Sequence, residues 1–311
     1  MYSASFILFS LSLSFHGTCA VCFKFWVVCS GRESQIRSPP RPAMAAAGNR
    51  FALPTRKPPR RVSAPRARDI VLEPRLHVAP PAEVAAKLQD RHLVVGIDIE
   101  THDILGRHMK WWTGPFGFAT LADPFTLEEA RVVQIGWAIH AKREEPVVKE
   151  FLVRPAGFEV STSASAMHGI THENAMSRGA PLQDVMLEFM RDISQAHDLG
   201  GCLVAHHLEF DAGIVSEELV RAGLGHFQEL WHKIAKGGIC TMDPDIAHWT
   251  REVLSMEQVP WKSAIKLEVM CDKLLPGCKH LLLKKHTAGA DALLVTMLYR
   301  ELGQRAQHPP P

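Results

Sequence analysis

The chain has little of what disulfide-stabilised, zinc-binding or membrane-spanning proteins require. Its seven cysteines give no disulfide framework, because three of them fall in the N-terminal region and the others are scattered. Cys19 and Cys22 form a C-x-x-C pair, but no second pair or histidine completes a zinc pattern. Serines and Lys24 interrupt the apolar run at 6–28, so a membrane span is the least favoured interpretation there. No internal repeat is visible, which argues against a solenoid.

Acidic residues are almost missing from one end of the chain. Residues 1–68 contain eleven Lys and Arg but a single acid, Glu33, whereas the remainder carries 24 basic and 32 acidic residues. This composition predicts a disordered basic targeting leader at 1–68, followed by a linker at 69–90. The net acidic remainder argues against broad electrostatic binding of nucleic acid, and it is expected if bound metal ions supply the local positive charge.

The leader combines two signals. An apolar run at 6–13 is followed by small residues, and the stretch 30–68 is rich in Arg, Ser and Pro. Together they resemble the bipartite leader of a protein imported into a plastid, and mitochondrial import from an internal start at Met44 is an alternative. If residues 1–43 are untranslated upstream sequence instead, the nucleus or the cytoplasm is the destination. In each case we expect no membrane association of the mature form.

Carboxylates follow apolar segments at three places in the rest of the chain. The apolar run at 93–97 predicts a buried strand ending in Asp98, and Glu100 points to the same side two residues later. Asp211 follows a second short apolar strand at the start of a helix, and Asp291 opens the last helix. Buried unpaired acids pay a large desolvation cost, and four of them balance the charge of two divalent hard cations. The pattern therefore predicts a two-metal phosphodiesterase.

In this order, the three motifs resemble those of the DEDDh exonucleases of the DnaQ-like family. The first motif is DIET at 98–101, the second is AHHLEFD at 205–211, and the third is HTAGADA at 286–292. The resemblance covers about residues 91–302. A single D-x-E is a very weak signal, whereas all three motifs in order make the match specific.

The resemblance implies a ribonuclease-H-like α/β fold, with a mixed five-stranded sheet flanked by helices in a single catalytic domain at 91–305. Two further segments match the family, VQIG at 133–136 and HGIT at 168–171. From the apolar pattern we expect strands at 92–100, 130–141, 146–155 and 202–205, and helices at 181–196, 211–222, 262–275 and 288–302. The first three strands form an antiparallel meander, and later strands join in parallel through helical crossovers.

An insertion of about residues 103–129 separates the first two strands, where relatives have a short turn. It contains the sequence RHMKWW at 107–112. Interleaved basic and aromatic residues suit a single-stranded nucleic acid, because bases stack on rings while Lys and Arg contact phosphates. In the alternative interpretation, the tryptophans simply pack the insertion onto the domain.

The resemblance also implies a mechanism. Five side chains would carry it: Asp98, Glu100, Asp211, Asp291 and His286. The four acids would hold two Mg²⁺ or Mn²⁺ ions, and the histidine would be the general base, since imidazole has a reference pKa of about 6.5. The spacing to Asp291 places His286 on the loop before the helix. The expected reaction is 3′→5′ exonucleolytic hydrolysis of single-stranded DNA or RNA, which releases nucleoside 5′-monophosphates.

A pocket for the terminal nucleotide is implied by the same resemblance. Its candidate residues are Thr101, His168, Gly169, Ile170, His207 and Phe210. His207 departs from the family pattern, since many relatives have Asn at this position.

Two other classes of function stay open. One is a catalytically idle nucleic-acid-binding protein on the same fold, and the presence of His286 argues against it. The other is a metal phosphohydrolase that acts on small phosphate esters, and the order of the motifs argues against that. The choice between DNA and RNA is open because specificity lies in the pocket rather than in the fold. A homodimer is compatible with the resemblance.

Overall fold

The computed structural model describes residues 78–104, 129–256, 265–283 and 286–307. The leader at 1–68 and nearly all of the insertion at about 103–129 lie outside these residues, so the expectations for them stay predictions. Within the described part of the chain, no helix combines the length and the apolar character needed to cross a membrane.

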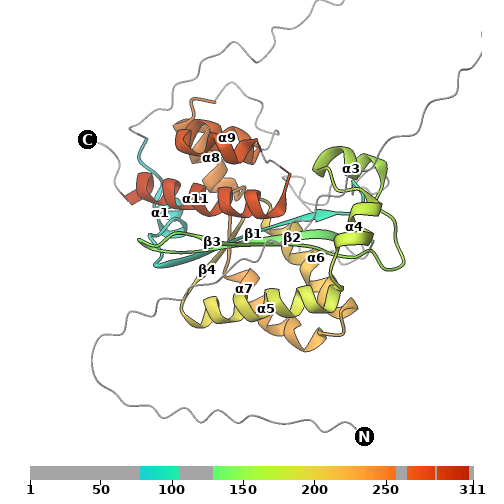
Figure 1. Ribbon diagram of the computed structural model, residues 1–311. Coiled ribbons are helices and arrows are strands. Elements are labelled where there is room, and N and C mark those ends of the chain that lie inside the picture. Colours follow the sequence, from blue (N-terminus) through green and yellow to red (C-terminus); the bar gives the residue numbers. More distant parts are fainter. Residues whose placement is uncertain (1–77, 105–128, 257–264, 284–285, 308–311) are drawn as a thin grey trace, which may run out of the picture. The chain divides into compact units, whose positions relative to one another are not determined.

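Five strands of the described chain form one mixed sheet in the order β3-β2-β1-β4-β5. The strands are β1 (Leu93–Thr101), β2 (Val132–Ala141), β3 (Val147–Leu152), β4 (Cys202–Ala205) and β5 (Ile239–Cys240). Strands β1, β2 and β3 form an antiparallel meander, whereas β4 is parallel to β1 and β5 is parallel to β4. This is the mixed five-stranded sheet that we expected, an antiparallel meander joined by parallel strands (Figure 1).

Helices cover both faces of the sheet (Figure 1). One face carries α1 (Ala82–Lys87), α8 (Pro244–Val253), α9 (Leu267–Leu274) and α11 (Ala288–Gln307). The other face carries α5 (Leu182–Asp198), α6 (Leu208–Arg221) and α7 (Gln228–Lys236). The described part of the chain also contains α3 (Thr162–His168), α4 (His172–Arg178) and α10 (Lys279–Leu282). The sheet thus separates two apolar cores.

Strand β1 contributes to both cores because its side chains alternate between the faces. Val95 and Ile97 pack with α5 and α6, whereas Val94 packs with α11 on the other face. Asp98 and Glu100 lie four and six residues after Val94, so their side chains are on the same face of the strand as Val94. Along the α11 face, the strand therefore changes from apolar to acidic side chains toward its carboxyl end.

Most expected elements are confirmed. Strand β4 has the predicted bounds, and the ends of β1, β2 and β3 differ from the prediction by three residues at most. Helix α6 begins at Leu208, so Asp211 lies in its first turn, three residues after the helix begins. The part of the expected helix at 262–275 before residue 265 lies outside the described chain. The sequence analysis did not locate the fifth strand, β5, and it did not predict α1, α3, α4, α7, α8 or α10.

Helix α1 lies within the segment 69–90 that was predicted to be a linker. Val84 and Leu88 are fully buried in the core beneath α11, and the Trp249 indole N–H donates to the Val78 carbonyl oxygen at 3.1 Å. The last part of this segment therefore belongs to the folded domain, because its apolar side chains complete the core.

Helix α11 approaches the sheet closely at two glycines. A Cβ atom on Gly96 would lie 2.0 Å from the Thr296 hydroxyl oxygen and 2.2 Å from the Ala292 carbonyl oxygen. A Cβ atom on Gly136 would lie 2.3 Å from the Gly289 amide nitrogen. A packed interior has no room to relieve such contacts. Glycine at both positions therefore lets the helix backbone lie directly against the strands.

We predict that Gly96→Ala destabilises the protein, because the added methyl group must push α11 away from β1. The expected loss in the free energy of unfolding is about 1–3 kcal/mol, typical of an overpacked core. Urea unfolding followed by circular dichroism measures it. Gly277→Ala is the matched control, since a Cβ atom there meets nothing within 4 Å. Equal unfolding midpoints for the two variants would contradict the prediction.

Candidate active site

Two carboxylates come from the carboxyl end of β1. Asp98 lies opposite Gly136 of β2, and Glu100 lies opposite Gln134. Because Gly136 has no side chain, the first turn of α11 occupies the space above it. Asp98 and Glu100 therefore face the start of α11.

A third carboxylate follows the neighbouring strand. Strand β4 runs parallel to β1 with Ala205 opposite Ile97, so the carboxyl ends of both strands meet at one edge of the sheet. His207 then adopts a left-handed conformation, with φ of 93°, and α6 begins. Asp211 lies in the first turn of α6 and is 2% exposed. The helix N-terminus favours a negative charge at this place.

The start of α11 supplies the remaining two predicted side chains. Asp291 lies in its first turn, and His286 lies on the loop two residues before the helix begins, as predicted. His286 has a left-handed backbone, with φ of 62°, and its amide N–H donates to Asp291 Oδ2 at 3.1 Å. The loop is thus tied to the helix turn that it precedes.

Side chains from two of the three motifs meet closely enough to share an ion. One potential ligand atom from each of Glu100, His286 and Asp291 lies within 4.8 Å of the other two. Asp98 and Asp211 are close enough that their negative charges act on this group and on each other. The structure therefore brings Glu100, His286 and Asp291 together, and it places Asp98 and Asp211 close enough to interact electrostatically with the acids of this group.

The carboxylates are strained electrostatically. Burial raises the pKa of Asp98 well above its ordinary value, and the negative charges of the other three acids add to this effect. Burial, with the charges of Asp291 and Glu150, raises the pKa of Glu100 to about 8. The pKa of Asp211 is also raised, mainly by burial and then by Glu100. The cluster is therefore stable only if protons or cations offset its charge.

Hard divalent cations fit this set of donors. Carboxylate oxygens are the ligands that Mg²⁺ and Mn²⁺ prefer, and four carboxylates match the charge of two such ions. Asp98, Glu100, Asp211 and Asp291 would hold them.

The structure adds two residues that the sequence analysis did not place in the site. The Gln134 side-chain oxygen accepts from the Ala288 amide, and Glu150 Oε2 accepts from the Gly289 amide, both at 2.9 Å. Gln134 was noted as part of a family segment, but Glu150 was missed. Glu150 could have been found only as an acid that pairs with Gly136 on the neighbouring strand, and the sequence does not show which residues of two strands pair.

The predicted pocket residues around His168 brace the end of β1. His168 Nδ1 accepts from the Ile170 amide at 3.1 Å, so Nε2 carries the proton and donates to the Thr101 carbonyl oxygen at 3.2 Å. Burial lowers the pKa of His168, which keeps the ring neutral. Gly169 ends α3 with φ of 77°, and Ile170 is 7% exposed in a small apolar cluster. These contacts hold the strand end beside the acids, and contact with a substrate stays a prediction.

His207 and Phe210 lie together at the start of α6. Their rings stack with centroids 5.6 Å apart and planes 9° from parallel. Burial lowers the pKa of His207 to about 4, so the ring is neutral at physiological pH. Phe210 directly precedes Asp211, and His207 lies four residues before it. The role of the pair toward a substrate also stays a prediction.

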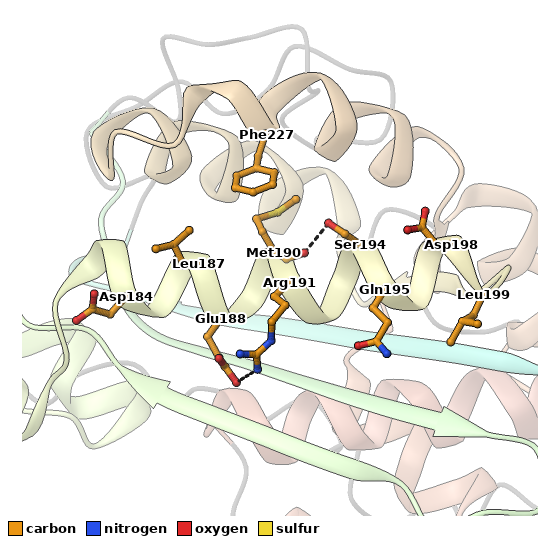
Figure 2. Close-up of a pocket in the computed structure, with 10 residues that line it drawn as sticks. All are labelled: Asp184, Leu187, Glu188, Met190, Arg191, Ser194, Gln195, Asp198, Leu199 and Phe227. Atoms are coloured by element: carbon orange, nitrogen blue, oxygen red, sulfur yellow. Dashed lines mark hydrogen bonds and ion pairs between the residues drawn. The ribbon is translucent and has the colours of Figure 1, made fainter. Parts of the chain in front are cut away.

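A separate hollow of about 760 Å³ runs along α5 (Figure 2). Its apolar lining residues are Leu187, Met190, Leu199 and Phe227, and two further lining residues, Glu188 and Arg191, form an ion pair. None of the predicted site residues lines it.

Comparison with solved structures finds similar folds among exonucleases. Exonuclease I from Methylocaldum szegediense has 16% identity over 70% of this chain and 41% of its own, with a TM-score of 0.48. A zinc-bound E. coli exonuclease I in complex with single-stranded DNA has 15% identity over 70% of this chain and 42% of its own, with a TM-score of 0.46. S. pombe Pop2p in its Mg²⁺- and Mn²⁺-bound form has 16% identity over 73% of this chain and 89% of its own, with a TM-score of 0.46.

The chain thus spans about two-fifths of the length of these two exonuclease I structures. At such identities, the likeness is one of fold. No protein-family model matches the chain, and no curated protein sequence matches it.

We predict that the metal-free protein loses stability as the pH rises from about 4.5 to about 8. The pKa of Glu100 rises from 4.5 to about 8 on folding, so the folded state binds more protons than the unfolded state within this window. The loss should exceed about 1.4 kcal/mol, the free energy that corresponds to a pKa difference of one. Urea unfolding in EDTA at a series of pH values measures it, and Glu100→Gln should flatten the profile. A profile that Glu100→Gln leaves unchanged would refute the assignment.

Proposed function

We propose that this protein is a metal-dependent 3′→5′ exonuclease of the DEDDh type, acting on single-stranded DNA or RNA. The observation that supports it most is the convergence of Asp98, Glu100, Asp211, Asp291 and His286 at one edge of the sheet. These side chains come from three distant segments, and their mutual repulsion has no structural benefit. Such an arrangement is expected where cations bind and take part in chemistry.

The four carboxylates would hold two Mg²⁺ or Mn²⁺ ions. When bound, these ions would offset the negative charge, activate a water molecule and stabilise charge on the leaving 3′ oxygen. Asp98 and Glu100 lie on β1, the central strand of the sheet, which is paired on both sides and therefore holds them rigidly. Asp211 and Asp291 lie on helices that cover opposite faces of that sheet.

His286 would act as the general base. It lies on the loop before α11, and the hydrogen bond from its amide N–H to the Asp291 carboxylate keeps it beside the acids. The imidazole would take the proton from the attacking water as the new phosphorus–oxygen bond forms. The bond to the 3′ oxygen breaks, which releases a nucleoside 5′-monophosphate, and the departing 3′ oxygen takes a proton from solvent to become a new 3′ hydroxyl group.

Charge supports a substrate that is held at its end rather than along its length. The chain after residue 68 carries more acids than bases, so a long phosphate backbone would gain little from it electrostatically. A single-stranded 3′ end can place its terminal phosphodiester at the acids without such extended contacts.

We predict that the full chain shortens 5′-labelled single-stranded oligonucleotides from the 3′ end in Mg²⁺ and not in EDTA. Separate DNA and RNA oligomers of one sequence, resolved on denaturing gels, give the direction and the preferred polymer. Hydrolysis of nitrophenyl phosphate esters is assayed in parallel. If only these small esters are cleaved, the protein is a small-ester phosphohydrolase. If oligomers bind without cleavage, it is a nucleic-acid-binding protein.

We predict that Asp98→Ala and Asp291→Ala each abolish exonuclease activity, because each removes a metal ligand from the cluster. His286→Ala should lower kcat by roughly 10²–10⁴-fold, the usual contribution of a general base. Single-turnover digestion of the preferred oligomer measures both effects. Asp272→Ala and His280→Ala are matched controls at exposed positions on α9 and α10. Full activity in either carboxylate variant would exclude the proposed site.

A further inference from the structure

Side chains from the sheet hold the first turn of α11. The N–H groups in the first turn of a helix have no partner inside the helix. Here the Ala288 N–H donates to Gln134 Oε1 and the Gly289 N–H donates to Glu150 Oε2, each at 2.9 Å. Gln134 of β2 and Glu150 of β3 therefore cap the N-terminus of α11.

The strand register places these two acceptors beside the carboxylates of β1. Glu150 lies opposite Gly136, and Gly136 lies opposite Asp98, so these residues form one row across three strands. Gln134 lies opposite Glu100 in the next row. The anchoring points of α11 and the acids of β1 thus belong to the same small area of the sheet.

The anchored turn carries both residues that α11 contributes to the site. Asp291 is two residues after Gly289, and its carboxylate accepts from the His286 amide at 3.1 Å. The fit at the anchor is tight, because a Cβ atom on Gly289 would lie 2.8 Å from Glu150 Oε2. The place of this turn on the sheet therefore decides how far Asp291 lies from Glu100.

We propose that Glu150 is a positioning residue for the metal-binding carboxylates. It acts through its hydrogen bond to the Gly289 amide, which fixes the turn that brings Asp291 to Glu100. The inference rests on the proposed function in one respect, namely that the acids of the site bind divalent cations.

The chemical type of Glu150 fits this role. A carboxylate accepts a stronger hydrogen bond from an amide than a neutral group does, and its charge is favourable at a helix N-terminus. The same charge is unfavourable for Glu100, whose pKa it raises. The hydrogen bond, rather than the charge, is therefore the property that benefits the site.

The test is the affinity of the full chain for Mn²⁺, measured by isothermal titration calorimetry after EDTA treatment and dialysis. Glu150→Ala should weaken binding by about tenfold or more, as loss of a residue that orients metal ligands does. Glu150→Gln should stay within about threefold of wild type, because its amide oxygen still accepts from Gly289. Glu150→Asp should weaken binding like Glu150→Ala, since it keeps the charge but is one methylene too short.

Glu188→Ala is the control for a general loss of stability. It removes an ion pair with Lys149, 2.7 Å long, on the opposite face of the sheet, and it should leave Mn²⁺ affinity unchanged. Circular dichroism tests whether each variant is folded. If Glu150→Ala is not folded, the Mn²⁺ affinities of Glu150→Gln and Glu150→Asp test the positioning role.

Three results would overturn the positioning role: wild-type affinity in Glu150→Ala, equal weakening in Glu150→Gln, or wild-type affinity in Glu150→Asp. Asp98→Ala identifies the titrated site as the acidic cluster. If the wild-type protein binds no Mn²⁺ at that cluster, both this inference and the proposed function fail. If wild type binds and Glu150→Ala binds equally well, only the positioning role fails.

Discussion

The first half of α11, from Ala288 to Thr296, lies directly on the sheet where Gly96 and Gly136 carry no side chains, and the acidic cluster depends on this contact. With any larger residue at either glycine, the helix backbone would have to move outward. Asp291 would then move away from β1, while Asp98 and Glu100 would stay with the strand. The closeness of helix and sheet is thus a condition of the site as well as of the core, because the same helix serves both.

That closeness has an electrostatic cost. Four carboxylates share a partly desolvated region, and the pKa of at least three of them is raised by burial and by their neighbours. A protein gains no stability from such repulsion. The apolar cores on the two faces of the sheet hold the acids in place despite it, since each acid is attached to an element that is anchored elsewhere by buried side chains. Bound cations would turn the repulsion into attraction.

The carboxyl end of β1 is also held by hydrogen bonds that do not involve α11. His168 donates to the Thr101 carbonyl oxygen, and the Asp103 carboxylate accepts from the Ser161 hydroxyl at 2.6 Å. The Arg131 amide donates to His102 Nδ1 at 3.3 Å, which joins the residues on either side of the insertion. The strand end beside the acids is therefore fixed by contacts from the α3 segment and from the start of β2.

The sequence by itself located four of the five strands, and it predicted the side chains that the structure places near the carboxyl end of β1. An apolar run that ends in Asp98 and Glu100 is a local signal, and so are the bounds of β4 and the loop position of His286. It did not determine α1 or β5, because a six-residue helix and a two-residue strand are too short to show a period. Nor did it show Glu150 as the anchor of α11, since the bond to Gly289 joins residues 139 positions apart. Only the tertiary structure decides such contacts, because they depend on strand register and on how closely a helix packs, and neither is a property of a local segment.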